Sequence, residues 1–483
     1  MRIFRQPFVI LIITLVFGLA CKINVGDGPL IALPSPTPLP PLPDIVPTVS
    51  VGQDPAAGQS PADPVAPGEP TPVATLVVPL EPANINNAAS AAELGLTTID
   101  YLGDVSAEQI TALQSKFYPA SNQIPARYGV ARYQIRFRSY NENGRVTPIR
   151  SEIFIPRVGA PSELPVFVYG AGTSGIGNNC APLDEAVHGR NWGEYQVHML
   201  SYAGQGYISM LPHWHGYDDQ TRTHLYFIAK MEAMIMLDAT RAVYTFFAAP
   251  PADIQARPAQ AVFFGGYSQG GHGALAGLDF ATQYAPELPI KGVIGHATAP
   301  NVEALMRERP PLGPYIVYAY LNYYGGEIID PAQVFLPNWL PTFYTDASTK
   351  CVDEVYEYYP TDPTRLYQPG FLDALYTGQL GERYPLFKAA LDQNQVGGTV
   401  EATAPVLLLH GAADNIVTPD TIDVFIGQLC NLGKNVNYKF YPEINHFQTR
   451  QYGFVDTLTW MQAVLAGAPP ESGCSEFFNS KFE

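Results

Sequence analysis

The chain has 483 residues, of which 47% are hydrophobic, and a formal net charge of −17 at pH 7. This length allows one large domain or two ordinary ones, and the apolar share is enough to bury a sizeable core. The acidic excess, without any run rich in lysine and arginine, argues against a nucleic-acid partner, because phosphates require a basic face.

The first 21 residues have the pattern of a signal peptide. Arg2 and Arg5 precede an apolar run over 8–20 that ends at Cys21. A membrane span needs about 20 apolar residues, so this run is too short to span comfortably. Gly18-Leu19-Ala20-Cys21 resembles a bacterial lipoprotein cleavage box, with glycine where leucine is usual. We expect a lipid on Cys21 that anchors the protein to a membrane; an ordinary secretory signal is the alternative.

Residues 22–92 form a segment crowded with proline, alanine and glycine. No aromatic residue occurs between Cys21 and Tyr101. Such a composition cannot bury enough apolar area to offset the entropy lost on ordering. We predict a disordered, semi-stiff tether, followed by one folded domain over 93–483.

Short apolar strands alternate with helices through the predicted domain. Ser106 and Gln109 form a capping-box pattern for a helix that ends near Phe117. A long helix is expected over 225–247 and a closing helix over 449–465. Strands are expected over 132–140, 150–156, 165–169, 206–211, 261–267, 291–295, 405–410 and 435–441. This alternation predicts an α/β fold, with a mostly parallel sheet and helices on both faces.

Residues 301–403 break this alternation, because no clean strand occurs there and aromatic residues are abundant. A stretch of about a hundred residues is too long for a loop without structure of its own. We therefore predict a mainly helical cap inserted into the domain. Its aromatic side chains, among them Trp339 and Phe343, should either line a binding pocket or form the core of the cap.

The motif Gly266-Tyr267-Ser268-Gln269-Gly270 lies between a predicted strand and a helix of small residues. This is the context of the G-x-S-x-G nucleophile elbow of α/β-hydrolases. Gly266 and Gly270 avoid the clash that a side chain would cause at so tight a turn. The helix N-terminus favours the negative charge that develops near the serine. The motif predicts Ser268 as a nucleophile.

A serine hydroxyl is a weak nucleophile unless a base accepts its proton. In α/β-hydrolases the acid and then the histidine follow the serine along the chain. Asp414 comes just after a buried strand, at the edge where open α/β sheets carry function, and is the expected acid. Asp420 and Asp423, in the following helix, are the alternatives. His446, in a polar loop before the last helix, is the expected base, whereas His410 should bond locally.

An oxyanion hole needs two backbone N–H donors. One should be the N–H of Gln269, the residue after the predicted nucleophile. The other should come from the loop after the strand predicted over 165–169, where glycines permit close approach of the backbone. Ala171 is the first choice there and Gly172 the second.

Four cysteines remain if Cys21 is set aside: Cys180, Cys351, Cys430 and Cys474. An even number in an exported chain favours two disulfides, and three pairings are possible.

His213 and His215 would point to one side of an extended strand, as two metal ligands do, but no third ligand is visible. We therefore expect no metal site. Packing is the expected role of both residues and of His272.

Together these motifs resemble the secretory lipase family of α/β-hydrolases over roughly residues 125–465. The segments that carry the resemblance are Tyr169-Gly170-Ala171-Gly172-Thr173, Asn179-Cys180-Ala181-Pro182, Gly266-Tyr267-Ser268-Gln269-Gly270-Gly271, His410-Gly411-Ala412-Ala413-Asp414 with Pro419, and Asn445-His446-Phe447. The resemblance implies an exported esterase or lipase that needs no cofactor, and disulfides Cys180–Cys351 and Cys430–Cys474. The family tends to have Pro-Asp-Tyr where this chain has Pro212-His213-Trp214.

On this resemblance we expect the chain to cleave a small-molecule or lipid ester through an acyl-enzyme on Ser268, with His446 and Asp414 completing a triad. Two alternatives stay open. One is a serine peptidase of the prolyl-oligopeptidase type, although the chain is short for the large accessory domain of such enzymes. The other is a non-catalytic surface protein of the same fold.

Overall fold

The computed structural model describes residues 95–219 and 221–482, whose strands form one nine-stranded sheet. The predicted signal peptide and tether lie outside the described residues. The strand order is β1-β2-β3-β5-β4-β6-β7-β8-β9. The strands are β1 (Leu96–Val105), β2 (Val130–Tyr140), β3 (Val146–Pro156), β4 (Ser162–Gly170), β5 (Ile208–Pro212), β6 (Ala256–Tyr267), β7 (Ile290–His296), β8 (Val406–Gly411) and β9 (Val436–Tyr441).

The sheet is mostly parallel, which confirms the predicted α/β-hydrolase fold. β4 to β9 pair in parallel, whereas β1, β2 and β3 pair antiparallel and β3 joins β5 in the same way. The carboxyl ends of β6, β8 and β9 therefore meet at one edge. That edge carries all three predicted triad residues.

Helices cover both faces of the sheet, and strand residues alternate between them. In β4, Val166 and Val168 pack into one apolar core with α3 and α4, whereas Phe167 and Tyr169 pack into the other with α1, α2 and α14. The helices outside the insertion are α1 (Ala107–Phe117), α2 (Tyr195–Gly204), α3 (Ala229–Ala248), α4 (Gln269–Tyr284), α13 (Pro419–Asn431), α14 (Thr449–Leu465) and α15 (Cys474–Phe482). Short 3-10 turns occur at Ala120–Asn122, Asn178–Cys180, Pro182–Asp184, Pro310–Leu312, Pro363–Arg365 and His446–Gln448.

Local signals account for some of these elements and not for others. The predicted capping box of Ser106 is present at the start of α1. β1 was not expected, because it is exposed along most of its length and only its pairing with β2 defines it. α2 was not expected either, because it is buried on nearly all sides and shows no amphipathic period. The helix expected over 225–247 begins at Ala229, because Phe227 has a φ of 55° that interrupts helical backbone.

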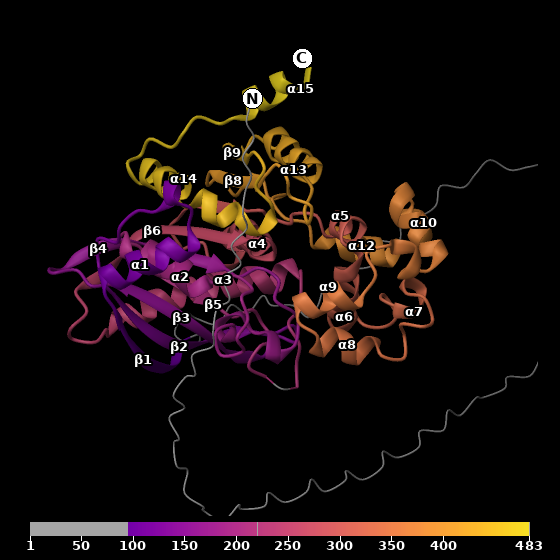
Figure 1. Ribbon diagram of the computed structural model, residues 1–483, viewed down its shortest axis with the longest axis horizontal. Coiled ribbons are helices and arrows are strands. Elements are labelled where there is room, and N and C mark those ends of the chain that lie inside the picture. Colours follow the sequence, from indigo (N-terminus) through magenta and orange to yellow (C-terminus); the bar gives the residue numbers. More distant parts are fainter. Residues whose placement is uncertain (1–94, 220, 483) are drawn as a thin grey trace, which may run out of the picture. The chain divides into compact units, whose positions relative to one another are not determined.

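A helical insertion lies between β7 and β8, where a cap was predicted over 301–403, and gathers at one side of the sheet (Figure 1). Its helices are α5 (Val302–Glu308), α6 (Gly313–Tyr324), α7 (Pro331–Val334), α8 (Phe343–Thr349), α9 (Val352–Tyr358), α10 (Pro369–Thr377), α11 (Leu380–Arg383) and α12 (Pro385–Gln393). Phe343 is buried against Phe335, and Trp339 packs on Tyr359. Phe343 and Trp339, which the sequence singled out, thus pack in the apolar core of this insertion.

Two disulfides tie distant segments together. Cys180–Cys351 joins the loop after β4 to the start of α9, and Cys430–Cys474 joins α13 to α15. These are the pairs that the family resemblance implies. Within the described residues, no helix has both the length and the apolar character needed to cross a membrane.

Candidate active site

Ser268 occupies the tight turn between β6 and α4. Its φ is +54°, a left-handed conformation that residues other than glycine rarely adopt. Its N–H donates to the carbonyl of His296 on β7 (2.9 Å). A Cβ on Gly266 would lie 1.9 Å from the carbonyl oxygen of Gly270, and a Cβ on Gly270 would lie 1.9 Å from that of Gly170. Glycine at positions 266 and 270 therefore lets the turn close against β4.

The loops after β8 and β9 bring Asp414 and His446 together. Asp414 Oδ2 lies 2.7 Å from His446 Nδ1, and both side chains are buried. Asp414 Oδ1 accepts the N–H groups of Ile416 (2.8 Å) and Val417 (3.0 Å). Burial favours the neutral acid, but the facing His446 and these hydrogen bonds hold the pKa of Asp414 below its ordinary value. The carboxylate therefore remains ionised and fixes the orientation of the His446 ring.

The other candidates for acid and base are Asp420, Asp423 and His410. Asp420 and Asp423 belong to α13, whereas the hydrogen bond to His446 comes from Asp414. His410 Nε2 lies 3.0 Å from the carbonyl oxygen of the nearby residue 417, so this ring bonds locally, as expected. Burial lowers the pKa of His410 to about 4, which keeps its ring neutral at pH 7.

Ser268 and His446 line one cavity of about 150 Å³. The rest of its wall is mainly apolar or aromatic and consists of Thr173, Asn191, Trp192, Tyr267, Leu312, Val352, Asp353, Tyr356, Ile416 and Phe447. Among the described contacts, the Ser268 hydroxyl is not hydrogen-bonded to His446. Catalytic hydrogen bonds are often long without substrate and shorten when it binds.

The loop after β4 contains Ala171 and Gly172, the two residues expected to supply an oxyanion donor. The N–H of Gly172 donates to the hydroxyl of Tyr195 (2.7 Å), so Gly172 does not offer this donor to the cavity. Ala171 is fully buried and is not part of the cavity wall, whereas Thr173 is. The contact with Tyr195 was not foreseen, because Tyr195 belongs to α2, which the sequence did not reveal. Gln269, the other expected donor, is the first residue of α4.

The model of the secretory lipase family matches residues 194–309 and 350–473, and these segments contain Ser268, Asp414 and His446. The chain belongs to the secretory lipase family. It is a carboxylic-ester hydrolase. The family and the two disulfides together indicate an extracellular protein.

Solved structures share the fold of this secretory lipase. A hydrolase candidate from Legionella pneumophila has a TM-score of 0.64 at 17% identity, over 76% of this chain and 98% of its own. The rice cell wall degrading esterase LipA from Xanthomonas oryzae has a TM-score of 0.59 at 18% identity, over 77% of this chain and 96% of its own. Candida antarctica lipase A in its closed state has a TM-score of 0.58 at 18% identity, over 82% of this chain and 87% of its own. A search of curated proteins gave no match. At these identities the likeness shows the fold alone.

A buried polar network lies behind the nucleophile elbow of this secretory lipase. Gln269 Nε2 donates to Glu232 Oε1 (2.8 Å). His272 Nδ1 lies 2.6 Å from Glu232 Oε2, and its Nε2 lies 2.7 Å from the carbonyl oxygen of Asn394. Both nitrogens of the His272 ring therefore have a hydrogen-bond partner. Asn394 follows α12 directly, so the network joins the elbow to the insertion.

Glu232 is a residue that the sequence reasoning missed. It lies in the first turn of α3 and is buried among residues that are almost all apolar. A buried carboxylate requires a charged or hydrogen-bonding partner, and this was the available signal. His272, which was expected to be structural, is that partner.

His213 and His215 are buried and bond to different partners. His213 Nδ1 lies 2.8 Å from Asp218 Oδ2, and His215 Nε2 lies 3.2 Å from Thr147 Oγ1. Among the described residues, no cluster of three or more histidine, cysteine, aspartate or glutamate side chains could hold a metal ion. Both histidines thus contribute hydrogen bonds to the interior.

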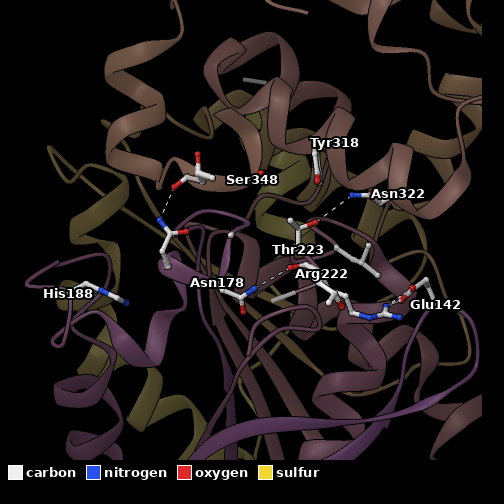
Figure 2. Close-up of a pocket in the computed structure, with 13 residues that line it drawn as sticks. Glu142, Asn178, His188, Arg222, Thr223, Tyr318, Asn322 and Ser348 are labelled. Carbon is white, nitrogen blue, oxygen red and sulfur yellow. Dashed lines mark hydrogen bonds and ion pairs between the residues drawn. The ribbon is translucent and has the colours of Figure 1, made fainter. Parts of the chain in front are cut away.

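A larger cavity of about 830 Å³ shares none of its wall with the cavity beside Ser268 (Figure 2). Its wall is polar, and side chains there pair with one another, as Arg222 does with Glu142 (2.8 Å). Its serine, Ser348, donates to the carbonyl of Tyr344 (2.7 Å) and so is not activated by a base. Ser268 and His446 both line the smaller cavity instead.

Proposed function

We propose that Ser268, His446 and Asp414 form the catalytic triad with which this secretory lipase cleaves carboxylic esters. One observation carries the proposal: His446, hydrogen-bonded to Asp414 at 2.7 Å, shares a cavity wall with a serine held at a nucleophile elbow. His446 takes the proton of the Ser268 hydroxyl while the serine oxygen attacks the acyl carbonyl carbon. Asp414 stabilises the imidazolium that forms.

The imidazolium of His446 then protonates the alcohol as the C–O bond of the ester breaks, which leaves the acyl group on Ser268. Water, deprotonated by His446, attacks the carbonyl carbon of this acyl-enzyme, and the imidazolium returns the proton to the Ser268 oxygen as the acid is released. The negative charge on the carbonyl oxygen in both steps needs two fixed donors. We assign them to the backbone N–H groups of Gln269 and Thr173. Tyr195 supports this assignment, because its hydroxyl accepts the N–H of Gly172, the residue before Thr173, and so fixes the loop.

Parallel assays on p-nitrophenyl esters and peptide anilides test this function. We expect ester hydrolysis by the wild-type protein, none by Ser268→Ala, and little anilide hydrolysis by either. Faster hydrolysis of the anilides would favour a peptidase of the prolyl-oligopeptidase type. Failure to cleave either substrate, together with no reaction with a fluorophosphonate probe, would favour a non-catalytic surface protein.

We further propose that the chain is exported by the signal peptide over 1–21 and lipidated on Cys21, and that residues 22–92 tether the enzyme to the membrane. The basic start, the short apolar run and the cysteine that ends it support this proposal. Full-length protein expressed in a bacterium with an alkyne-tagged palmitate tests it. We expect label in the membrane fraction, and Cys21→Ser should abolish the label and release the enzyme. Unlabelled, soluble wild-type enzyme would instead indicate an ordinary secretory signal.

A further inference from the structure

The cavity beside Ser268 is small. Its volume is about 150 Å³, and Leu312, Tyr356 and Ile416 contribute to a mainly apolar wall. An apolar cavity of about 150 Å³ in another protein binds benzene, a molecule of six carbon atoms. Binding pockets for larger ligands usually reach about 300 Å³ or more. The space next to the nucleophile therefore suits a short acyl group.

One side of this cavity is fastened covalently to the body of the enzyme. Val352 and Tyr356 belong to α9, and Cys351, directly before α9, is bonded to Cys180 in the loop after β4. The N–H of Val352 also donates to the carbonyl of Ser174 in that loop (2.8 Å). An enlargement of the cavity on this side requires α9 to move away from the loop, and the disulfide opposes that movement.

Charged residues hold the same helix. Arg190 forms ion pairs with Asp353 and with Glu354 (3.3 Å), both in the first turn of α9. Trp192, another residue of the cavity wall, donates its indole N–H to Asp353 (3.3 Å). These pairs are partly exposed, so each contributes little by itself. Together they fix the direction of α9 around the covalent link.

A second contact fastens the insertion to the loop that follows β8. Glu308, the last residue of α5, accepts the backbone N–H of Thr418 (3.0 Å) and its hydroxyl (2.8 Å). Thr418 caps α13 and lies four residues after Asp414. Leu312, which lines the cavity, follows Glu308 by four residues along the chain.

We propose that the cavity restricts this enzyme to esters of short-chain acids, up to about six carbon atoms, and that the Cys180–Cys351 disulfide maintains the restriction by holding α9 in place. The proposal rests on the proposed function of Ser268. It concerns the acyl group of the ester, which the apolar wall would enclose.

Wild-type enzyme and two disulfide variants test this proposal with p-nitrophenyl butyrate, hexanoate and laurate. In the wild type, kcat/KM for laurate should be at least about tenfold below that for butyrate, because a pocket discriminates by about tenfold or more per ill-fitting methylene. The double variant Cys180→Ser/Cys351→Ser should raise the ratio of laurate to butyrate about tenfold. Cys430→Ser/Cys474→Ser is the matched control, because it removes the disulfide away from the cavity and should leave the ratio unchanged.

A second pair of variants decides the question if the disulfide variant does not fold. Tyr356→Ala enlarges the cavity directly, whereas Tyr358→Ala changes an exposed residue of the same helix outside the cavity wall. We expect the laurate-to-butyrate ratio to rise in the first variant only. Equal or better hydrolysis of laurate by the wild type, or equal effects of the two variants, would overturn the proposal. The proposed function itself fails only if no ester is cleaved and a fluorophosphonate does not label Ser268.

Discussion

The cavity at Ser268 is built by two regions of the molecule that are positioned in different ways. The strand ends of the sheet supply Ser268, Asp414 and His446, each placed by a turn directly after a strand. The helical insertion supplies Leu312 and Tyr356, which depend on a disulfide, ion pairs and packing between segments far apart in the sequence. Reaction chemistry thus rests on local backbone geometry, and selectivity rests on long-range contacts. Mutations should be able to change one without the other.

The largest loss of activity should come from substitutions of the residues at the strand ends of the sheet. Ser268→Ala removes the nucleophile and should lower kcat for a p-nitrophenyl ester by about 10⁶, as removal of a triad serine does elsewhere. His446→Ala should cost about as much. Asp414→Asn should cost about 10⁴, because the amide favours the wrong tautomer of the histidine. Steady-state assays measure the loss of kcat in each variant, and circular dichroism checks that the variants fold. Retention of half the activity by any of them would contradict the triad.

Loss of the Cys430–Cys474 disulfide should destabilise the enzyme without changing its chemistry. The bridge spans 44 residues, for which loop-closure entropy gives about 4 kcal/mol as an upper guide. Urea unfolding of Cys430→Ser/Cys474→Ser should show this loss in the free energy of unfolding, while kcat of the folded fraction stays near the wild-type value. A large fall in kcat would show that the C-terminal part also supports the active site.

Glycine substitutions compare the two regions directly. Gly266→Ala places a Cβ 1.9 Å from the carbonyl oxygen of Gly270, so the backbone must shift, at a cost of about 3 kcal/mol. Gly398→Ala, between the insertion and β8, meets no atom within 4 Å and should be neutral or stabilise by about 0.5 kcal/mol. Thermal unfolding of both variants measures the difference. Similar melting temperatures would mean that the elbow is not closely constrained.

A small loss of stability should come from Glu232→Gln, in the network that links the elbow to the insertion. The amide keeps the shape of the carboxylate, and a neutral His272 can accept a hydrogen bond from it while still donating to Asn394. We expect the free energy of unfolding to fall by about 1 kcal/mol. A loss of several kcal/mol in urea unfolding would instead show that the buried charge itself is required.

The same contrast explains what could be predicted from the sequence. Local sequence signals predicted Ser268, Asp414 and most strands. A glycine-flanked turn or an apolar run can be recognised from a few neighbouring residues. Gly172 could not be excluded as an oxyanion donor, because its N–H is bound by Tyr195 from a helix without amphipathic pattern. Tyr356 could not be separated from the other aromatic residues of the insertion, because its place in the cavity wall depends on a disulfide to a distant loop.

The most direct test of this account is to identify the nucleophile of the enzyme. The folded enzyme would be reacted with a fluorophosphonate, digested, and analysed by mass spectrometry, with Ser268→Ala and His446→Ala in parallel. We predict a single adduct on the peptide that contains Ser268, its absence from Ser268→Ala, and labelling of His446→Ala slowed by several orders of magnitude. An adduct on another residue, or labelling of Ser268 that leaves ester hydrolysis intact, would contradict the assignment of Ser268 as the nucleophile.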